Sequence, residues 1–214
     1  MATRYDPHGT EAEFEPGSHG RVLRNLPGVR SVREMARHES DALLAATRRL
    51  VDETGAHQRF TADDICRMHR LWLDEIYPWA GQYRQVNVSK GGFVFAVAAQ
   101  VPRLMSEFER GPLRQFTPCL FDDAARQART LAVVHTELVL IHPFREGNGR
   151  CARLLAMLMG LQAGLPALDF GGVRGEEKRR YILAVQAGLD RNYEPMTIVF
   201  RRIVARTLRS QAGD

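Results

Sequence analysis

A short segment of the sequence, residues 142–153, carries a histidine, a glutamate, two glycines and three arginines, of which Arg150 and Arg153 lie three residues apart. Helical periods flank it, and the second of these helices is expected to begin inside it, with Arg150 and Arg153 in its opening turns. Gly147 and Gly149 permit close backbone approach, and the N–H groups that open a helix bind phosphate. Each arginine can hold phosphate oxygens through paired charged hydrogen bonds. The segment therefore predicts a site for a polyphosphate.

The same segment contains a candidate metal ligand and a candidate base. Glu146 lies beside the predicted phosphate site, where a carboxylate is the usual protein ligand for Mg²⁺. His142 has an unperturbed pKa suited to accepting a proton near neutral pH. Taken singly, a His-Pro step, a Gly-Asn-Gly run or an arginine pair is commonplace in turns and on helix surfaces. Their conjunction between two helices favours a functional site.

The elements that position this segment are mostly helices. Residues 1–30 are rich in proline and glycine and are expected to form an irregular N-terminal leader, with the folded domain over 31–214. Apolar residues recurring at steps of three and four predict a helix over 31–54, and a second helix begins at the N-cap Thr61 and ends before Pro78. Further helices are predicted over residues 99–110, 121–141, 148–163, 175–191 and 195–210. Proline and glycine residues, including Pro112, are expected to separate them.

Residues 83–97 differ in character from the rest of the chain. Val86, Val88, Phe93 and Phe95 favour strands, and the sequence Ser-Lys-Gly-Gly at residues 89–92 is typical of a turn. A single β-hairpin is therefore predicted in an otherwise helical chain.

Composition limits the classes of protein that the chain can represent. With 214 residues and 44% apolar content it can bury one core, and its longest apolar stretch, Leu154 to Leu161, is too short to span a bilayer. The first 30 residues do not resemble a secretory signal, and three widely spaced cysteines fit a reduced cytoplasm. The net charge of +5 comes from arginines mixed with acids, without a dense basic tail, which argues against nucleic acid as a partner.

The segment from His142 to Arg153 resembles the signature of Fic-domain proteins, His-x-Phe-x-[Asp/Glu]-Gly-Asn-Gly-Arg-x-x-Arg, at every fixed position. Residues 77–84, Tyr-Pro-Trp-Ala-Gly-Gln-Tyr-Arg, resemble the stretch that leads into the flap hairpin of that family, and the similarity extends over about residues 31–208. The resemblance implies the Fic fold, a mainly α bundle of about six to eight helices with one β-hairpin flap beside the active-site loop. It also implies a protein adenylyltransferase that uses ATP and Mg²⁺.

The resemblance also implies roles for individual residues. His142 would deprotonate the target hydroxyl, and Glu146 would bind Mg²⁺. Asn148 and the amides around Gly147 and Gly149 would hold the α- and β-phosphates. Arg150 would bind on the side of the β-phosphate, and Arg153 would bind the γ-phosphate. The flap would align the target backbone by strand addition through Val88, Lys90, Gly91 and Phe93.

One element found in many members of the family is missing from the sequence. Their inhibitory helix, [Ser/Thr]-x-x-x-Glu-[Gly/Asn], carries a glutamate that pairs with the second arginine of the signature. In this sequence the only glutamate followed by Gly or Asn is Glu146, which belongs to the signature itself. Either a separate small antitoxin chain supplies this glutamate, or a divergent internal helix does. Glu39 is the internal candidate, and it is expected to bind Arg153.

Other functions remain open at this point. The same residues could remove AMP from a protein, or transfer another group from a different nucleotide donor. A toxin-like role, with growth arrest as the outcome of modification, is compatible with AMP transfer. From another class, the chain could be a basic helical nucleic-acid-binding regulator in which Arg150 and Arg153 touch backbone phosphates; its binding would then fall steeply with salt and ignore Mg²⁺ and ATP.

Overall fold

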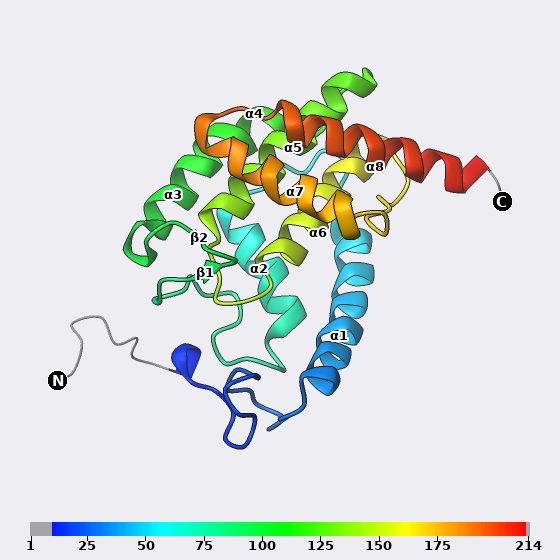
Figure 1. The fold of residues 1–214 in the computed structure, drawn as a ribbon. Helices are drawn as coiled ribbons and strands as arrows, with labels where there is room; N and C mark the ends of the chain where they lie inside the picture. The colour runs from blue at the N-terminus through cyan, green and yellow to red at the C-terminus, as the bar shows by residue number, and fades with distance from the viewer. Residues whose placement is uncertain (1–9, 213–214) are drawn as a thin grey trace.

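The computed structural model describes residues 10–212; residues 1–9 of the predicted leader and residues 213–214 lie outside the described range. Within that range the fold is mainly helical, with seven α-helices of eight residues or more and one two-stranded antiparallel sheet (Figure 1). The predicted fold class is thereby confirmed. The elements are α1 (Val32–Glu53), α2 (Ala62–Leu73), β1 (Ser89–Lys90), β2 (Phe93–Val94), α3 (Val101–Phe108), α4 (Arg114–Phe116), α5 (Ala124–Ile141), α6 (Asn148–Gln162), α7 (Gly175–Ala187) and α8 (Glu194–Ala212).

The first two helices begin where their capping residues predict. The Ser31 hydroxyl accepts a hydrogen bond from the N–H of Glu34 at the start of α1. Thr61 and Asp64 form a capping box at the start of α2, in which each side chain accepts from the other residue's backbone N–H. Both helices have one buried apolar face, so the predictions of a helix over 31–54 and of a helix starting at Thr61 are confirmed.

Helix α5 is the central element of the bundle. Most of its residues are buried, from Gln127 near its start to Ile141 at its end. A helix that is apolar on nearly all sides must be surrounded by others, and α5 packs against α3, α6, α7 and α8, with α8 running across it in Figure 1. The main hydrophobic core therefore lies around α5 and α6, the two helices that flank residues 142–147.

The remaining helices agree with the predicted periods, with one difference around Pro112. The helix predicted over 99–110 is α3, which ends at Phe108, but the chain continues through a π-helical turn (Glu109–Leu113) into α4. Pro112 was expected to separate two helices, and that expectation was wrong. Proline has no N–H to donate one turn back, so the hydrogen-bonded ladder widens here without ending.

Part of the predicted leader packs against the helices. Phe14 and Leu23 form an antiparallel bridge, and Val22 and Val29 are buried in a second hydrophobic cluster that includes Trp72 of α2. The division between a leader and a domain at residue 30 stays a prediction. The packing shows that residues 22–29 share a core with α1 and α2.

No helix in residues 10–212 combines the length and the apolar character that crossing a bilayer requires.

Candidate active site

His142 lies at the C-terminal end of α5 in a left-handed conformation, with φ 53° and ψ 59°. Its N–H donates to the carbonyl oxygen of Leu138, at 3.1 Å, and so closes the helix. Its ring nitrogen Nδ1 lies 3.0 Å from the carbonyl oxygen of Val139. Because a carbonyl can only accept, Nδ1 must carry the proton of the neutral ring. The lone pair is then on Nε2, which makes this atom available as a base.

The surroundings of His142 keep its ring neutral. Phe95, from the chain just beyond β2, stacks on it with ring centroids 3.6 Å apart and planes inclined by 18°. Burial lowers the pKa of His142 to about 4, and the positive charge of Arg84 acts in the same direction. The imidazole is therefore unprotonated at neutral pH, as a general base must be. Phe95 was predicted only as a strand residue, and its contact with His142 depends on how the hairpin folds back.

The loop after His142 is held in place by His69 of α2, which contacts Phe144 and Glu146. The His69 ring stacks on the buried Phe144 ring at 3.8 Å. Its Nδ1 accepts from the N–H of Gly81 at 2.8 Å, and its Nε2 donates to the carbonyl oxygen of Glu146 at 3.1 Å. Sequence reasoning missed His69. The available signal was a histidine on the apolar face of a predicted helix, next to Met68 and close to Trp72.

The two signature glycines differ in their geometry. Gly147 has φ +82°, and a Cβ atom there would lie 2.6 Å from the ring of Trp72. Gly149 has no such strain, because it lies in the first turn of α6 and a Cβ atom there would meet no other group within 4 Å. Gly147 therefore adopts a backbone conformation that favours glycine, and Gly149 does not.

The side chain of Asn148 is used inside the loop. Its Oδ1 accepts from the N–H of Phe144 and its Nδ2 donates to the Phe144 carbonyl, both at 2.8 Å, and the residue is 3% exposed. Both ends of the amide are thus bonded to the loop backbone. Asn148 can offer a nucleotide its main-chain N–H, which as an opening amide of α6 has no partner within the helix.

Arg150 is held by two carboxylates and an aromatic ring. Its Nη1 lies 2.7 Å from Oε2 of Glu39, its Nη2 lies 3.4 Å from Oε1 of Glu146, and its guanidinium lies 4.5 Å from the centre of the Trp72 ring. Glu39, 7% exposed, also accepts a hydrogen bond from the Tyr77 hydroxyl at 2.8 Å. Glu39 was expected to bind Arg153, and the structure corrects this: it binds the first arginine of the signature, Arg150.

Arg153 lies one turn further along α6 and is partly buried. Burial lowers its pKa, and the charge of the neighbouring Arg150 lowers it further, whereas Tyr181 acts in the opposite direction. Two guanidinium groups that repel each other at the start of one helix attract an anion. The structure thus brings Arg150 and Arg153 together with the opening amides of α6, as the sequence predicted.

Glu146 fits the role of a metal ligand that works together with a phosphate. Its side chain is 43% exposed, and its Oε1 already accepts from the N–H of Gly147 at 2.9 Å. Within residues 10–212 no group of three His, Cys, Asp or Glu side chains is arranged to hold a metal. One carboxylate suits Mg²⁺, which usually takes one or two protein carboxylates and completes its octahedron with phosphate oxygens and water.

The predicted hairpin is present, with shorter strands and a different turn. Ser89 pairs with Val94 and Lys90 with Phe93, so Ser89 and Lys90 form a strand although they were predicted as part of the turn. Gly91 and Gly92 alone make the turn, with φ of 58° and 80°, because a two-residue turn of this hand requires positive φ at both positions.

The flap residues named from the sequence lie at the exposed end of this hairpin. Lys90 and Gly91 are exposed, and Val88 and Phe93 are partly exposed. The Phe93 ring meets the Phe95 ring at 5.1 Å, edge to face, and Phe95 in turn covers His142. The hairpin therefore lies directly beside the candidate base.

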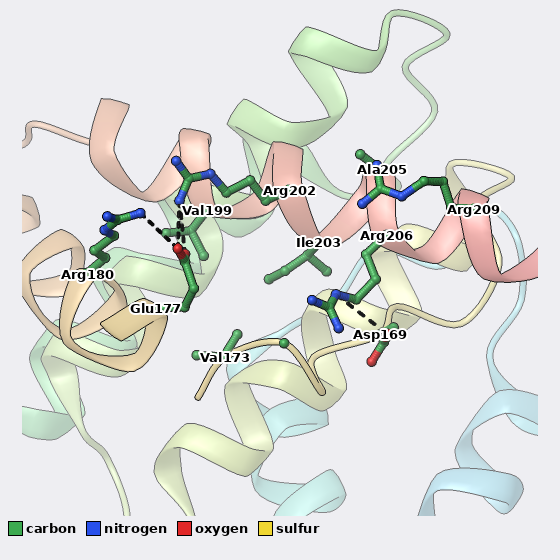
Figure 2. Close-up of a pocket in the computed structure, with 11 residues that line it drawn as sticks. Asp169, Val173, Glu177, Arg180, Val199, Arg202, Ile203, Ala205, Arg206 and Arg209 are labelled. Carbon is green, nitrogen blue, oxygen red and sulfur yellow. Dashed lines mark hydrogen bonds and ion pairs between the residues drawn. The ribbon is translucent and has the colours of Figure 1, made fainter. Parts of the chain in front are cut away.

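A separate cavity of about 440 Å³ lies between α7, α8 and the segment around residues 169–173 (Figure 2). No residue of the 142–153 segment lines it. Glu177 pairs with Arg180 and Arg202, both at 2.9 Å, and Asp169 lies 3.8 Å from Arg206. Carboxylates thus offset much of the positive charge of the arginines that line this cavity.

Comparison with known proteins places the site in a family. The sequence model of the Fic/DOC family matches residues 59–159. A probable protein adenylyltransferase Fic from Salmonella typhimurium is 28% identical over 204 residues, covering 92% of this chain and 94% of that protein. Protein adenylyltransferase VbhT from Bartonella schoenbuchensis is 28% identical over 185 residues, which cover 85% of this chain and 37% of VbhT.

The solved structures agree with the sequence match. The crystal structure of a BepC protein with bound AMPPNP from Bartonella tribocorum superimposes with a TM-score of 0.72 at 21% identity, covering 92% of this chain and 98% of that one. At this identity the similarity shows the fold alone. The family model spans the segment that carries His142, Glu146 and Arg150. Residues 59–159 of this chain therefore belong to the Fic/DOC family.

Proposed function

We propose that this chain is a protein adenylyltransferase, which transfers AMP from ATP to the hydroxyl group of a serine, threonine or tyrosine in a target protein. The observation that carries the proposal is the free Nε2 of a neutral His142 close to the start of α6, where the opening N–H groups of a helix can bind phosphate. Support also comes from the relatives in Salmonella typhimurium and Bartonella schoenbuchensis, which are named as protein adenylyltransferases.

The reaction requires one base and several fixed donors. The hydroxyl oxygen of the target forms a bond to the α-phosphorus of ATP, the bond from that phosphorus to the bridging oxygen breaks, and pyrophosphate leaves. The Nε2 atom of His142 takes the hydroxyl proton. Phosphoryl-group chemistry of this kind depends mainly on positioning and charge neutralisation, so no covalent enzyme intermediate is needed.

The start of α6 would hold the nucleotide. The main-chain N–H groups of Asn148 and Gly149 have no partner within the helix and point along the positive end of its dipole. Arg150 would bind β-phosphate oxygens and Arg153 the γ-phosphate. The N–H of Gly147 now donates to Glu146 and would have to exchange that partner for phosphate. AMPPNP in the related BepC protein fits an ATP site.

Glu146 would bind Mg²⁺ together with phosphate oxygens. A bound Mg²⁺ would neutralise the charge that develops on the phosphates. The Glu146 carboxylate can turn toward the nucleotide for two reasons. Its side chain is 43% exposed, and its bonds to Gly147 and Arg150 both use the same oxygen, Oε1.

The hairpin would register the target. Each of its two strands has one edge without a strand partner among residues 10–212, and such an edge accepts an extended peptide by strand addition. Lys90, Gly91, Val88 and Phe93 would contact that peptide, and its hydroxyl would then lie beside His142.

Glu39 would restrain the enzyme through Arg150. Its carboxylate competes with phosphate for the guanidinium and repels an anionic nucleotide. We predict that Glu39→Gln, which keeps an oxygen for the Tyr77 hydroxyl but removes the charge, raises nucleotide affinity and AMP transfer on the order of 5-fold. Calorimetry with ATP and a label-transfer assay would measure the two effects.

Asp41→Asn is the matched control for that variant. Asp41 lies on the same helix and is exposed, so its replacement removes the same charge without touching Arg150. An unchanged rate in both variants would sink the restraint by Glu39, and a lower rate in Glu39→Gln would instead assign Glu39 the task of orienting Arg150. A separate small antitoxin chain is the alternative source of inhibition, in a toxin-like enzyme of the reduced cytoplasm.

A nucleic-acid-binding regulator is the competing proposal from another class. It requires Arg150 and Arg153 to reach a phosphate backbone, but Arg150 is bound to Glu39 and Arg153 is partly buried. Removal of AMP and use of a different nucleotide donor are the competing proposals within the enzyme class, because they would use the same residues.

The proposal is tested by the fate of the label from ATP. The purified chain and its Glu39→Gln variant are incubated in a cell lysate with Mg²⁺ and ATP that is labelled at either the α- or the γ-phosphate. Label on protein from α-labelled ATP alone supports AMP transfer. Label from γ-labelled ATP would show phosphoryl transfer instead, and loss of AMP from proteins adenylylated beforehand would show the reverse reaction.

A further inference from the structure

Arg84 is a fully buried arginine whose hydrogen-bond acceptors among residues 10–212 are all main-chain carbonyl oxygens. It is 1% exposed. Its Nε donates to the carbonyl of His142 at 2.7 Å, and its Nη1 donates to that of Val86 at 2.7 Å. Its Nη2 donates to the carbonyl oxygens of Ala96 and, at 3.5 Å, Ile141. One guanidinium thus joins four carbonyls from three separate stretches of chain.

These acceptors belong to two functional parts of the molecule. Ile141 and His142 end α5, where carbonyls lack partners within the helix and carry the negative end of its dipole, so they stabilise a buried cation. Val86 and Ala96 lie on the two arms of the hairpin, one before β1 and one after β2. The main chain of Arg84 adds a fifth bond, because its N–H donates to the carbonyl of Pro143 at 2.9 Å.

We infer that Arg84 is a positioning residue that fixes both arms of the hairpin relative to the main chain of His142. The left-handed conformation of His142 is uncommon for residues other than glycine, and the bond to its carbonyl holds it there. The strands β1 and β2 have two residues each, too few to hold a hairpin in place by themselves. Arg84 therefore sets the distance from the flap to the base.

The consequence for catalysis rests on the proposed function. A target peptide added to the hairpin edge would have its hydroxyl registered against His142 only if flap and base keep a constant separation. A displacement of about 1 Å between reacting groups can reduce a rate by roughly 100-fold. Nucleotide binding uses the start of α6 and does not pass through Arg84.

The test compares Arg84→Lys with Arg202→Lys. Lysine keeps the charge and most of the stem, but its single nitrogen cannot reach carbonyls on three sides. Arg202 is exposed on α8 and pairs with Glu177, outside the site (Figure 2). Three quantities are measured for each variant: hydrogen exchange of the Phe95 amide, the dissociation constant for ATP with Mg²⁺, and the rate of AMP transfer. The Phe95 amide reports on the hairpin because it donates to the Val88 carbonyl.

Arg84→Lys is expected to speed exchange at Phe95 by about 10-fold, the factor that loss of one charged hydrogen bond gives. The rate of AMP transfer should fall by at least that factor. The dissociation constant for ATP and the amide hydrogen exchange of helices α5 to α8 should stay unchanged. Arg202→Lys should change none of these.

Unchanged exchange at Phe95 in Arg84→Lys would overturn the inference. So would a parallel loss of ATP binding and of protection throughout α5 to α8, because Arg84 would then support the whole fold. If the unmodified chain transfers no AMP, the proposed function fails, and exchange at Phe95 still decides the role of Arg84.

Discussion

Replacing His142 by alanine should reduce AMP transfer by roughly 100- to 10,000-fold, the contribution expected of a general base. The dissociation constant for ATP should change little, because the phosphates would be held by the start of α6, Arg150 and Arg153. The physical reason is that Nε2 is the free ring nitrogen, since Nδ1 is bonded to the Val139 carbonyl. Single-turnover transfer and calorimetry with ATP and Mg²⁺ measure the two quantities.

His142→Asn separates the base from the backbone. Asparagine tolerates the left-handed conformation that His142 adopts, so it keeps the end of α5 in place, but an amide cannot take up the proton. The asparagine variant should therefore lose transfer as completely as the alanine variant. Full transfer by His142→Asn would remove His142 from the role of base.

Replacing Gly147 by alanine should destabilise the protein strongly. The new Cβ would lie 2.6 Å from Trp72, and Trp72 cannot move aside because its Nε1 donates to the Glu39 carbonyl at 2.8 Å. Overpacking costs about 1–3 kcal/mol and a non-glycine residue at positive φ adds about 1–3 kcal/mol. We expect a loss of roughly 2–6 kcal/mol in the free energy of unfolding, which urea denaturation would measure, together with loss of AMP transfer.

Gly149→Ala is the matched control, from the same Gly-Asn-Gly run. Position 149 is in the first turn of α6 and has open space, and alanine favours a helix over glycine by about 1 kcal/mol. The variant should be as stable as the parent or slightly more so. Any loss of transfer would then report a Cβ that obstructs the nucleotide. Equal destabilisation by the two substitutions would contradict this account of Gly147.

The helices could be predicted from sequence because each depends on local signals. Ser31 and Thr61 cap the helices that follow them, and the long apolar period of α5 is visible without any partner. The hairpin was also visible, but its strand ends were not, because Ser89 and Lys90 have turn-like composition and become a strand only by pairing with Val94 and Phe93.

The site could be predicted in its residue types and only partly in its contacts. His142, Glu146 and the two arginines lie within one segment, so their proximity follows from the sequence. The partner of Glu39 did not, because 111 residues separate Glu39 from Arg150 and the choice between two arginines on one helix depends on how α1 packs against α2.

The roles of His69 and Arg84 could not be predicted from the sequence either, because both depend on contacts between residues far apart in the chain. His69 bonds to a carbonyl 77 residues away and Arg84 to one 58 residues away. Neither bond has a periodic or local signature. These two side chains hold the loop and the flap, and their tasks became evident from the folded chain.

The most direct test of AMP transfer by His142 is the mass spectrum of a modified target. Proteins labelled in a lysate by the Glu39→Gln chain with ATP and Mg²⁺ are digested, and the labelled peptides are compared with those from the Glu39→Gln, His142→Ala double variant. A single AMP on a serine, threonine or tyrosine oxygen, absent when His142 is replaced, is the predicted result. A different adduct, or the same adduct formed without His142, would contradict it.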